Sequence, residues 1–365
     1  MAADRQAAGL PVVWRVPLLV LGLLSLLAGV GAGLSRLGWP LPLPNDTLLA
    51  VHGPLMVAAF FGTVIGLERA VALGRRWGFA APACCGIGGV MLLAGLPLAA
   101  ALATSTLGAA LLTLVTLRAA RRQPALHTRL LSLAAALATL AGAAWLLDAH
   151  QLAVAGWMSF LVLTIAGERL ELSRFLPPSP VARRIFVGIV VLLLAALAAL
   201  GAGAVVSGQR VFGAALAALA LWLLRQDVAR RTVRQPGLTG FIALCLLSGY
   251  VWLLAGGGLL ALQPALPLLT DAALHAVFVG FVLAMVFGHA PIIFPAILRV
   301  KLPYHASFYL PLALLHLSLL LRVAGDLAGD AAWRAQGGLG NALCIAVFIA
   351  TMAAAVWRGR FAQAA

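Results

Sequence analysis

Charged side chains are scarce in this sequence. Asp, Glu, Lys and Arg make up 10% of its 365 residues, whereas a typical soluble domain carries roughly 25%. Hydrophobic residues make up 63%, and the mean hydropathy is +1.07. A soluble protein needs more charge to cover its surface, so this composition excludes a soluble domain. It predicts an integral membrane protein whose surroundings are the lipid bilayer.

Acidic residues are the scarcer charged type, with 10 against 25 Lys and Arg and a net charge of +15. Such a charge could indicate nucleic-acid binding. The arginines, however, stand in short loops between apolar segments and form no basic face with interleaved aromatic residues. We therefore interpret them as residues that orient the chain in a membrane, and we expect no nucleic-acid partner.

Cysteine is also rare, and its four copies offer no recognisable metal motif. None has the CxxC spacing of a metal finger, and no CxxCH motif is present for covalent haem attachment. We interpret all four as small core residues, with a copper-binding role as the alternative. They are Cys84, Cys85, Cys245 and Cys344.

Twelve apolar segments are long enough to span a membrane, which takes about 20 residues. The first, near Trp14 to Leu34, is long enough to be a span rather than a cleaved signal peptide. The expected spans are 14–34, 47–72, 78–99, 102–118, 128–149, 152–172, 183–204, 208–225, 238–262, 271–297, 305–323 and 338–357.

Arginines follow the even-numbered spans, as Arg75 and Arg76 follow the second, whereas acidic residues such as Asp148 and Asp330 follow odd-numbered ones. This alternation predicts that both termini are cytoplasmic and that the protein crosses the cytoplasmic (inner) membrane of a bacterium. We expect an all-α bundle of about 12 transmembrane helices that forms a single membrane domain over residues 1–365.

The second span of each group of four carries the polar residues. The segments that begin at His52, Trp157 and His275 are weakly similar, and placing His52 on His275 sets Gly66 opposite His289. This similarity predicts a pseudo-threefold arrangement of three four-helix units, approximately 14–118, 128–225 and 238–357.

Histidines within the spans are candidate ligands, because ionisable groups are costly in a bilayer. His52 lies about five residues into the second span and His275 about four into the tenth, roughly 6–9 Å below the outer boundary. His316 is expected at a similar depth. A six-coordinate haem needs two axial ligands at matched depth, and His52 with His275 fit that need. The alternative is that each histidine hydrogen-bonds a carbonyl or a serine of a neighbouring helix.

A second polar set lies near the inner boundary. It contains Glu68, Glu168, Arg169 and His289, and each of the two glutamates precedes an arginine. A solvated salt bridge is the default interpretation. Proton uptake from the cytoplasm and a second metal site are the alternatives. His289, in this set, and His316, at the depth of His52 and His275, are the further candidate metal ligands.

The HGPLM motif at His52, in the second of twelve spans, resembles the haem–copper oxidase catalytic subunit. That resemblance implies low-spin haem ligands at His52 and His275 and an arginine for the propionates at Arg322. The copper histidines of that family are missing from spans six and seven, and Ala273 stands where it has the high-spin haem ligand.

The last third of the chain resembles the NnrS family more closely. The similarity lies in LHAVFVGFVLAMVFGH from Leu274 and in LLLRVAG from Leu319 to Gly325. Proteins of that family are twelve-span membrane proteins that contain haem and copper and are tied to nitric oxide metabolism. The resemblance implies that Met56 accompanies His52 at the cofactor, where that family has a second histidine.

Together these features predict a membrane protein that binds haem b, with copper as a less supported addition. Its expected roles are nitric oxide response or detoxification, other small-gas handling, or electron transfer to an unidentified redox partner. The competing hypothesis is a cofactor-free transporter or ion-conducting protein that uses Glu68, Glu168 and His289. In that case Pro291 and Pro295 would break the tenth span.

Overall fold

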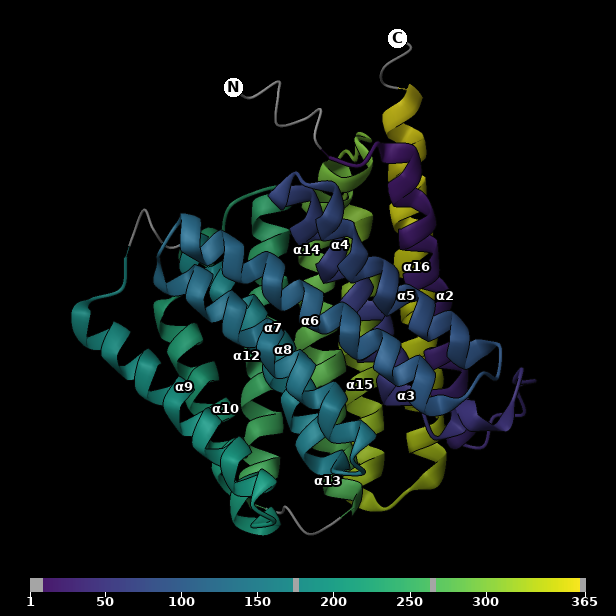
Figure 1. The fold of residues 1–365 in the computed structure, drawn as a ribbon, viewed down its shortest axis with the longest axis vertical. Coiled ribbons are helices and arrows are strands. Elements are labelled where there is room, and N and C mark those ends of the chain that lie inside the picture. Colours follow the sequence, from purple (N-terminus) through teal and green to yellow (C-terminus); the bar gives the residue numbers. More distant parts are fainter. Residues whose placement is uncertain (1–8, 173–176, 263–266, 362–365) are drawn as a thin grey trace. The chain divides into compact units, whose positions relative to one another are not determined.

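The computed structural model describes residues 9–172, 177–262 and 267–361 (Figure 1). Within these ranges every regular element is helical, and 12 helices are long and apolar enough to cross a membrane. The all-α, twelve-span fold predicted from the sequence is therefore confirmed. Helices suit a bilayer because each satisfies its own backbone hydrogen bonds where no water is present.

Each end of an observed span lies within seven residues of the expected one. They are Val12–Arg36, His52–Leu73, Arg76–Leu93, Leu98–Arg122, Leu126–Leu146, His150–Leu172, Pro180–Gly201, Val205–Gln226, Leu238–Leu262, Pro267–Leu298, Ala306–Ala328 and Ala331–Gly359.

Internal contacts divide the chain into two compact units. Unit 1 is Met1–Glu168 with Ile297–Arg299, and unit 2 is Arg169–Ala296 with Val300–Ala365. The boundary falls inside helix α8 (His150–Leu172), between Glu168 and Arg169. The three four-helix units expected from the sequence stay a prediction.

Unit 1 is built around its second span, which helices on several sides contact. Helix α2 packs against that span and against α5, α5 packs against α6, and α6 packs against α7. The elements of unit 1 are α2 (Val12–Arg36), η1 (Asp46–Leu49), α3 (His52–Pro54), η2 (Leu55–Phe61), α4 (Gly62–Leu73), η3 (Arg76–Phe79), α5 (Ala80–Leu93), α6 (Leu98–Arg122), α7 (Leu126–Leu146) and α8 as far as Glu168.

Unit 2 contains two helix pairs that lie side by side in Figure 1, α10 with α12 and α15 with α16. Helix α12 also contacts the middle of the tenth span. The elements are α9 (Pro180–Gly201), α10 (Val205–Gln226), α11 (Ala229–Thr232), α12 (Leu238–Leu262), α13 (Pro267–His275), η5 (Ala276–Leu283), α14 (Ala284–Leu298), η6 (Ala306–Phe308), α15 (Tyr309–Ala328) and α16 (Ala331–Phe361).

Two spans change from α-helix to π-helix, and each does so just after a histidine. In unit 1 the π-helical segment η2 begins three residues after His52. In unit 2 the π-helical segment η5 begins at the residue that follows His275. π-helical turns are rare and often mark functional sites. Their matching positions add a backbone likeness to the weak sequence likeness between these two spans.

The tenth span does not break at its prolines. Pro291 and Pro295 both lie inside helix α14, which continues to Leu298. The transporter hypothesis predicted a break in the tenth span at these prolines, and that prediction is wrong.

Candidate functional site

Helix α2 holds His52 in unit 1. The ring Nδ1 lies 2.6 Å from the Gly29 carbonyl oxygen. A Cβ at Gly33 would come within 2.9 Å of the ring, and one at Gly29 within 2.8 Å of the Met56 sulfur. The glycines at 29 and 33 therefore let α2 approach closely enough to receive His52 and Met56, which are also four residues apart.

His52 is the first residue of its span, and a short 3₁₀ turn, Asp46–Leu49, lies before it. The sequence placed it about five residues in. The difference arises because residues 46–51 form a 3₁₀ turn and a connection rather than the start of the membrane-spanning helix.

The helix that carries His275 in unit 2 also holds its ring. The ring Nδ1 lies 2.8 Å from the carbonyl oxygen of Asp271, one turn earlier on α13. The Asp271 carboxylate oxygen Oδ1 is 3.5 Å from the same nitrogen. His275 stands eight residues after Pro267, where the span begins, because the helix starts before the expected residue 271.

Both rings have the same tautomer. A carbonyl oxygen can only accept, so Nδ1 of His52 and of His275 donates and carries the ring proton. The basic lone pair of each ring is then on Nε2. Histidines that bind metals through Nε2 commonly have Nδ1–H oriented in this way by a carbonyl or a carboxylate.

Asp271 joins His275 to an arginine–carboxylate network in unit 2. Its Oδ2 accepts from Arg322 at 2.9 Å and lies 3.5 Å from Arg334, which also bonds Asp326. Arg322 and Asp326 are buried, with side chains 7% and 0% exposed. In the part of the chain that the structure describes, Arg322 Nε has no hydrogen-bond acceptor.

Sequence reasoning selected His275 and Arg322 but missed Asp271 as the residue between them. The signal was present, since a carboxylate four residues before a histidine faces the same side of a helix.

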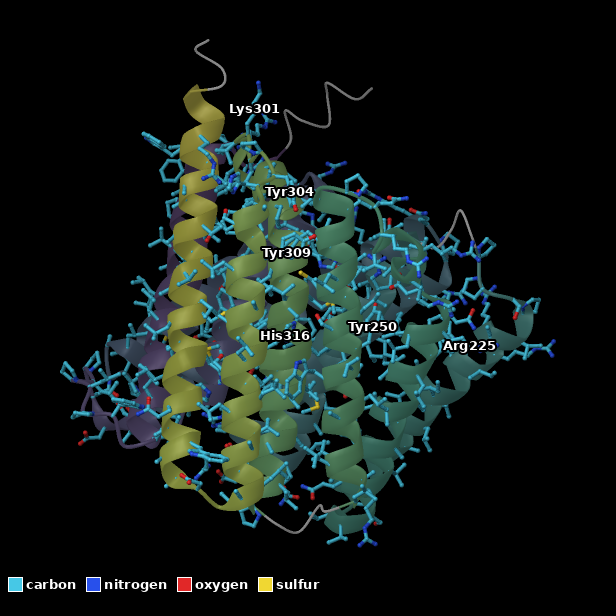
Figure 2. The ribbon with its side chains drawn as sticks, turned by 180° about the vertical axis from the view of Figure 1, so that it is seen from behind. Arg225, Tyr250, Lys301, Tyr304, Tyr309 and His316 are labelled. Atoms are coloured by element: carbon cyan, nitrogen blue, oxygen red, sulfur yellow. The ribbon has the colours of Figure 1, made fainter. Side chains whose placement is uncertain are left out.

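His316 is engaged at both ring nitrogens in unit 2. Trp252 Nε1 donates to its Nδ1 at 3.0 Å, and its Nε2 lies 3.0 Å from the Ser248 hydroxyl. Figure 2 shows His316 on α15, further from Lys301 than Tyr304 and Tyr309. Metal binding by His316 would require breaking one of these bonds.

His289, the other candidate ligand, bonds its own helix, with Nδ1 2.7 Å from the Met285 carbonyl oxygen. No three His, Cys, Asp or Glu side chains among the described residues are grouped as a metal centre. All four cysteines are free thiols, and three of them are buried.

Arg69 contacts both glutamates, Glu68 and Glu168, of the second polar set in unit 1. It bonds Glu168 and lies 3.5 Å from Glu68. The three side chains are 16–27% exposed. This network matches the salt-bridge interpretation of the two glutamates, with a single arginine between them.

Arg169 has a different partner, the Asp227 carboxylate in unit 2. Two hydrogen bonds join them, from Arg169 Nε at 2.7 Å and NH2 at 3.0 Å, and the Tyr250 hydroxyl donates to the same carboxylate at 2.5 Å. Burial alone raises the pKa of Asp227, but the charge and hydrogen bonds of Arg169, with the Tyr250 hydroxyl and the Ala229 N–H, outweigh it and lower that pKa.

Sequence reasoning missed Asp227 and Tyr250. The available signal was a lone acidic residue in a loop otherwise rich in arginine, RQDVARR from Arg225.

Fold and sites together define a polytopic, all-α membrane protein in which two spans share a histidine followed by a π-helical segment. The chain belongs to a family described as a domain of unknown function, DUF8744, whose family model matches residues 15–357. No curated protein and no solved structure matches the chain.

Proposed function

We propose that this protein binds haem b, with His52 and His275 as iron ligands, and that it is a relative of the NnrS family. One observation carries the proposal: a π-helical segment begins within three residues after each histidine, and each ring is oriented through Nδ1. The π-helical segment and the orientation of the histidine ring thus occur in both units, although the sequences of the two units are only weakly similar. His289 has the same Nδ1 arrangement but no π-helical segment after it, so the two π-helical segments are what favour a ligand role for His52 and His275.

The imidazoles suit an iron site because each ring has its lone pair on Nε2 in the neutral state. Neutral imidazole is a common ligand for haem iron. Met56 lies against α2 four residues after His52, in the position where the NnrS resemblance implies a second cofactor residue. We propose that Met56 would contact the haem rather than bind its iron.

Arg322 suits a haem carboxylate. Its buried Nε–H has no acceptor among the described residues, and a propionate oxygen is the kind of acceptor that a guanidinium binds well. Asp271 connects Arg322 to the turn of helix that carries His275. Asp271 and Arg322 would therefore fix the position of the haem propionate relative to the iron ligand His275.

Bound haem would supply an iron that takes up small gases or passes electrons. Nitric oxide response or detoxification, or electron transfer at the outer leaflet of a bacterial inner membrane, are the roles we propose. We place both termini in the cytoplasm on the distribution of arginines. Copper is left out of the proposal, because the described residues offer no group of three ligands.

Absorbance spectroscopy of the full chain, purified in detergent from haem-supplemented cells, tests the proposal. We expect a Soret band in the wild type, with a loss of haem or a shifted band in His52→Ala and in His275→Ala. His150→Ala, which changes an exposed histidine at the start of α8, should leave the spectrum unchanged. A wild-type protein without haem, or two ligand variants with wild-type spectra, would overturn the assignment.

The transporter hypothesis has less support. Glu68 and Glu168 are both engaged by Arg69, and the tenth span runs through its prolines. Ion flux into liposomes that contain haem-free protein would favour it.

A further inference from the structure

Unit 1 encloses a small cavity beside the π-helical segment η2. About 20 Å³ of it is open to the centre of a water-sized sphere, which is enough for one small molecule. Its wall comes from η2, α4, α5, α6, α7 and α8, and includes Val57, Ala58, Ala109, Ala138, Trp157 and Phe160. Every residue of the wall belongs to unit 1.

The residue sizes explain why the cavity stays open. Ala58, Ala109 and Ala138 have small side chains, so they leave space between the helices, whereas Cys85 and Thr106 fill the space beside Gly62 and Gly142. The π-helical form of η2 widens the helix at Val57 and Ala58. Native interiors rarely leave such voids, because each void forfeits dispersion contacts and packing energy.

The wall is uncharged and mostly apolar. Four residues of the wall carry a polar side-chain group: Cys85, Ser105, Thr106 and Trp157. Two of these groups are used by nearby backbone, since Thr106 donates to the Leu102 carbonyl at 2.8 Å and the Cys85 thiol to the Ser105 carbonyl at 3.7 Å. A water molecule needs two to four polar partners, and apolar cavities of protein interiors stay dry and bind apolar guests such as xenon. The wall therefore selects against ions and strongly polar molecules.

We propose that this cavity binds one small apolar gas molecule, of the size class of xenon, dioxygen or nitric oxide. The surrounding bilayer supplies such guests, because apolar gases partition into hydrocarbon. Val57 follows His52 by five residues, roughly 8 Å along a helix. If the proposed haem function holds, the cavity holds gas beside the span that carries a proposed iron ligand, but the gas site itself does not depend on haem.

Xenon pressurisation of crystals of the full chain tests the proposal. We expect an anomalous peak enclosed by Ala58, Ala138 and Phe160 in the wild type, with or without haem. Ala138→Leu should remove the peak by filling the space. Ala136→Leu, half-buried on the same helix and outside the wall, should retain it.

Ala109→Val provides a smaller filling change if Ala138→Leu does not fold, and it should lower xenon occupancy by at least half. Ordered water in the wild-type cavity, or xenon bound elsewhere in the protein but not here, would overturn the proposal. Neither result bears on the Soret band, so failure of the gas site is distinguishable from failure of haem binding.

Discussion

Units 1 and 2 orient their histidines through different parts of the fold. In unit 1 the neighbouring helix α2 supplies the Gly29 carbonyl that fixes His52. In unit 2 the ring of His275 bonds the carbonyl of its own helix, four residues earlier. The ring state is the same in both cases. His52 therefore depends on how closely two helices approach, whereas His275 depends on one turn of helix.

Their ion pairs differ as well, although each involves the arginine of a Glu-Arg dipeptide. Glu68-Arg69 lies within unit 1, whereas the chain passes from unit 1 to unit 2 between Glu168 and Arg169. Arg69 is part of a partly exposed network with two glutamates. Arg169 is buried and forms two hydrogen bonds to Asp227, which Tyr250 also contacts. One arginine thus takes part in a partly exposed network and the other in a buried pair, and the two arrangements should differ several-fold in energy.

The largest effect should come from removing the buried carboxylate. Asp227→Asn leaves the Arg169 guanidinium, 7% exposed, without that negative charge, and breaking a buried pair costs about 3–5 kcal/mol. Thermal unfolding of the detergent-solubilised protein measures the loss. Tyr250→Phe is a graded control that keeps the charge pair and removes one hydrogen bond, at about 1 kcal/mol. Equal losses of stability in the two variants would contradict the view that the buried ion pair causes the larger loss in Asp227→Asn.

Low pH should remove part of the same stabilisation, because it protonates the Asp227 carboxylate. The pKa of Asp227 is lowered in the folded protein, so its stabilisation is fully present above the unfolded-state pKa, about 3.9. That contribution is lost as the pH falls through the lower, folded-state pKa. The difference in melting temperature between wild type and Asp227→Asn should be largest near neutral pH and should shrink below about pH 4. A difference that stays constant or grows in acid would show that the carboxylate is not the titrating group.

The fold was largely predictable from the sequence, whereas the contacts around the candidate ligands were not. Long apolar runs fix the spans, because the bilayer sets both their length and their composition. The π-helical segments η2 and η5 leave no such signal, since their residues are as apolar as those of any span. Asp227 was missed because its pairing with Arg169 joins residues 58 apart in sequence, and composition carries no information on that contact.

Glycine positions on α2 offer a sharper test of how unit 1 orients His52. Gly33→Ala places a Cβ within 2.9 Å of the His52 ring, and such overpacking typically costs about 1–3 kcal/mol. Gly31→Ala is the matched control, because its Cβ would meet only Leu43 at 3.8 Å. We expect Gly33→Ala to lower both the melting temperature and the haem content, and Gly31→Ala to change neither. The dependence of His52 on α2 would be refuted by identical behaviour of the two variants.

Glu168→Gln should have the smallest effect and completes the comparison between the units. The side chains of Arg69 and Glu168 are 16% and 19% exposed, so water and salt screen their attraction, and Glu68 stays beside the arginine. Pairs of this kind contribute about 0–1 kcal/mol. Melting curves at low and high salt should show a small loss that shrinks as ionic strength rises. A salt-independent loss of stability as large as that of Asp227→Asn would contradict this view. It would mean that the partly exposed network around Arg69 and the buried pair of Arg169 stabilise the protein equally.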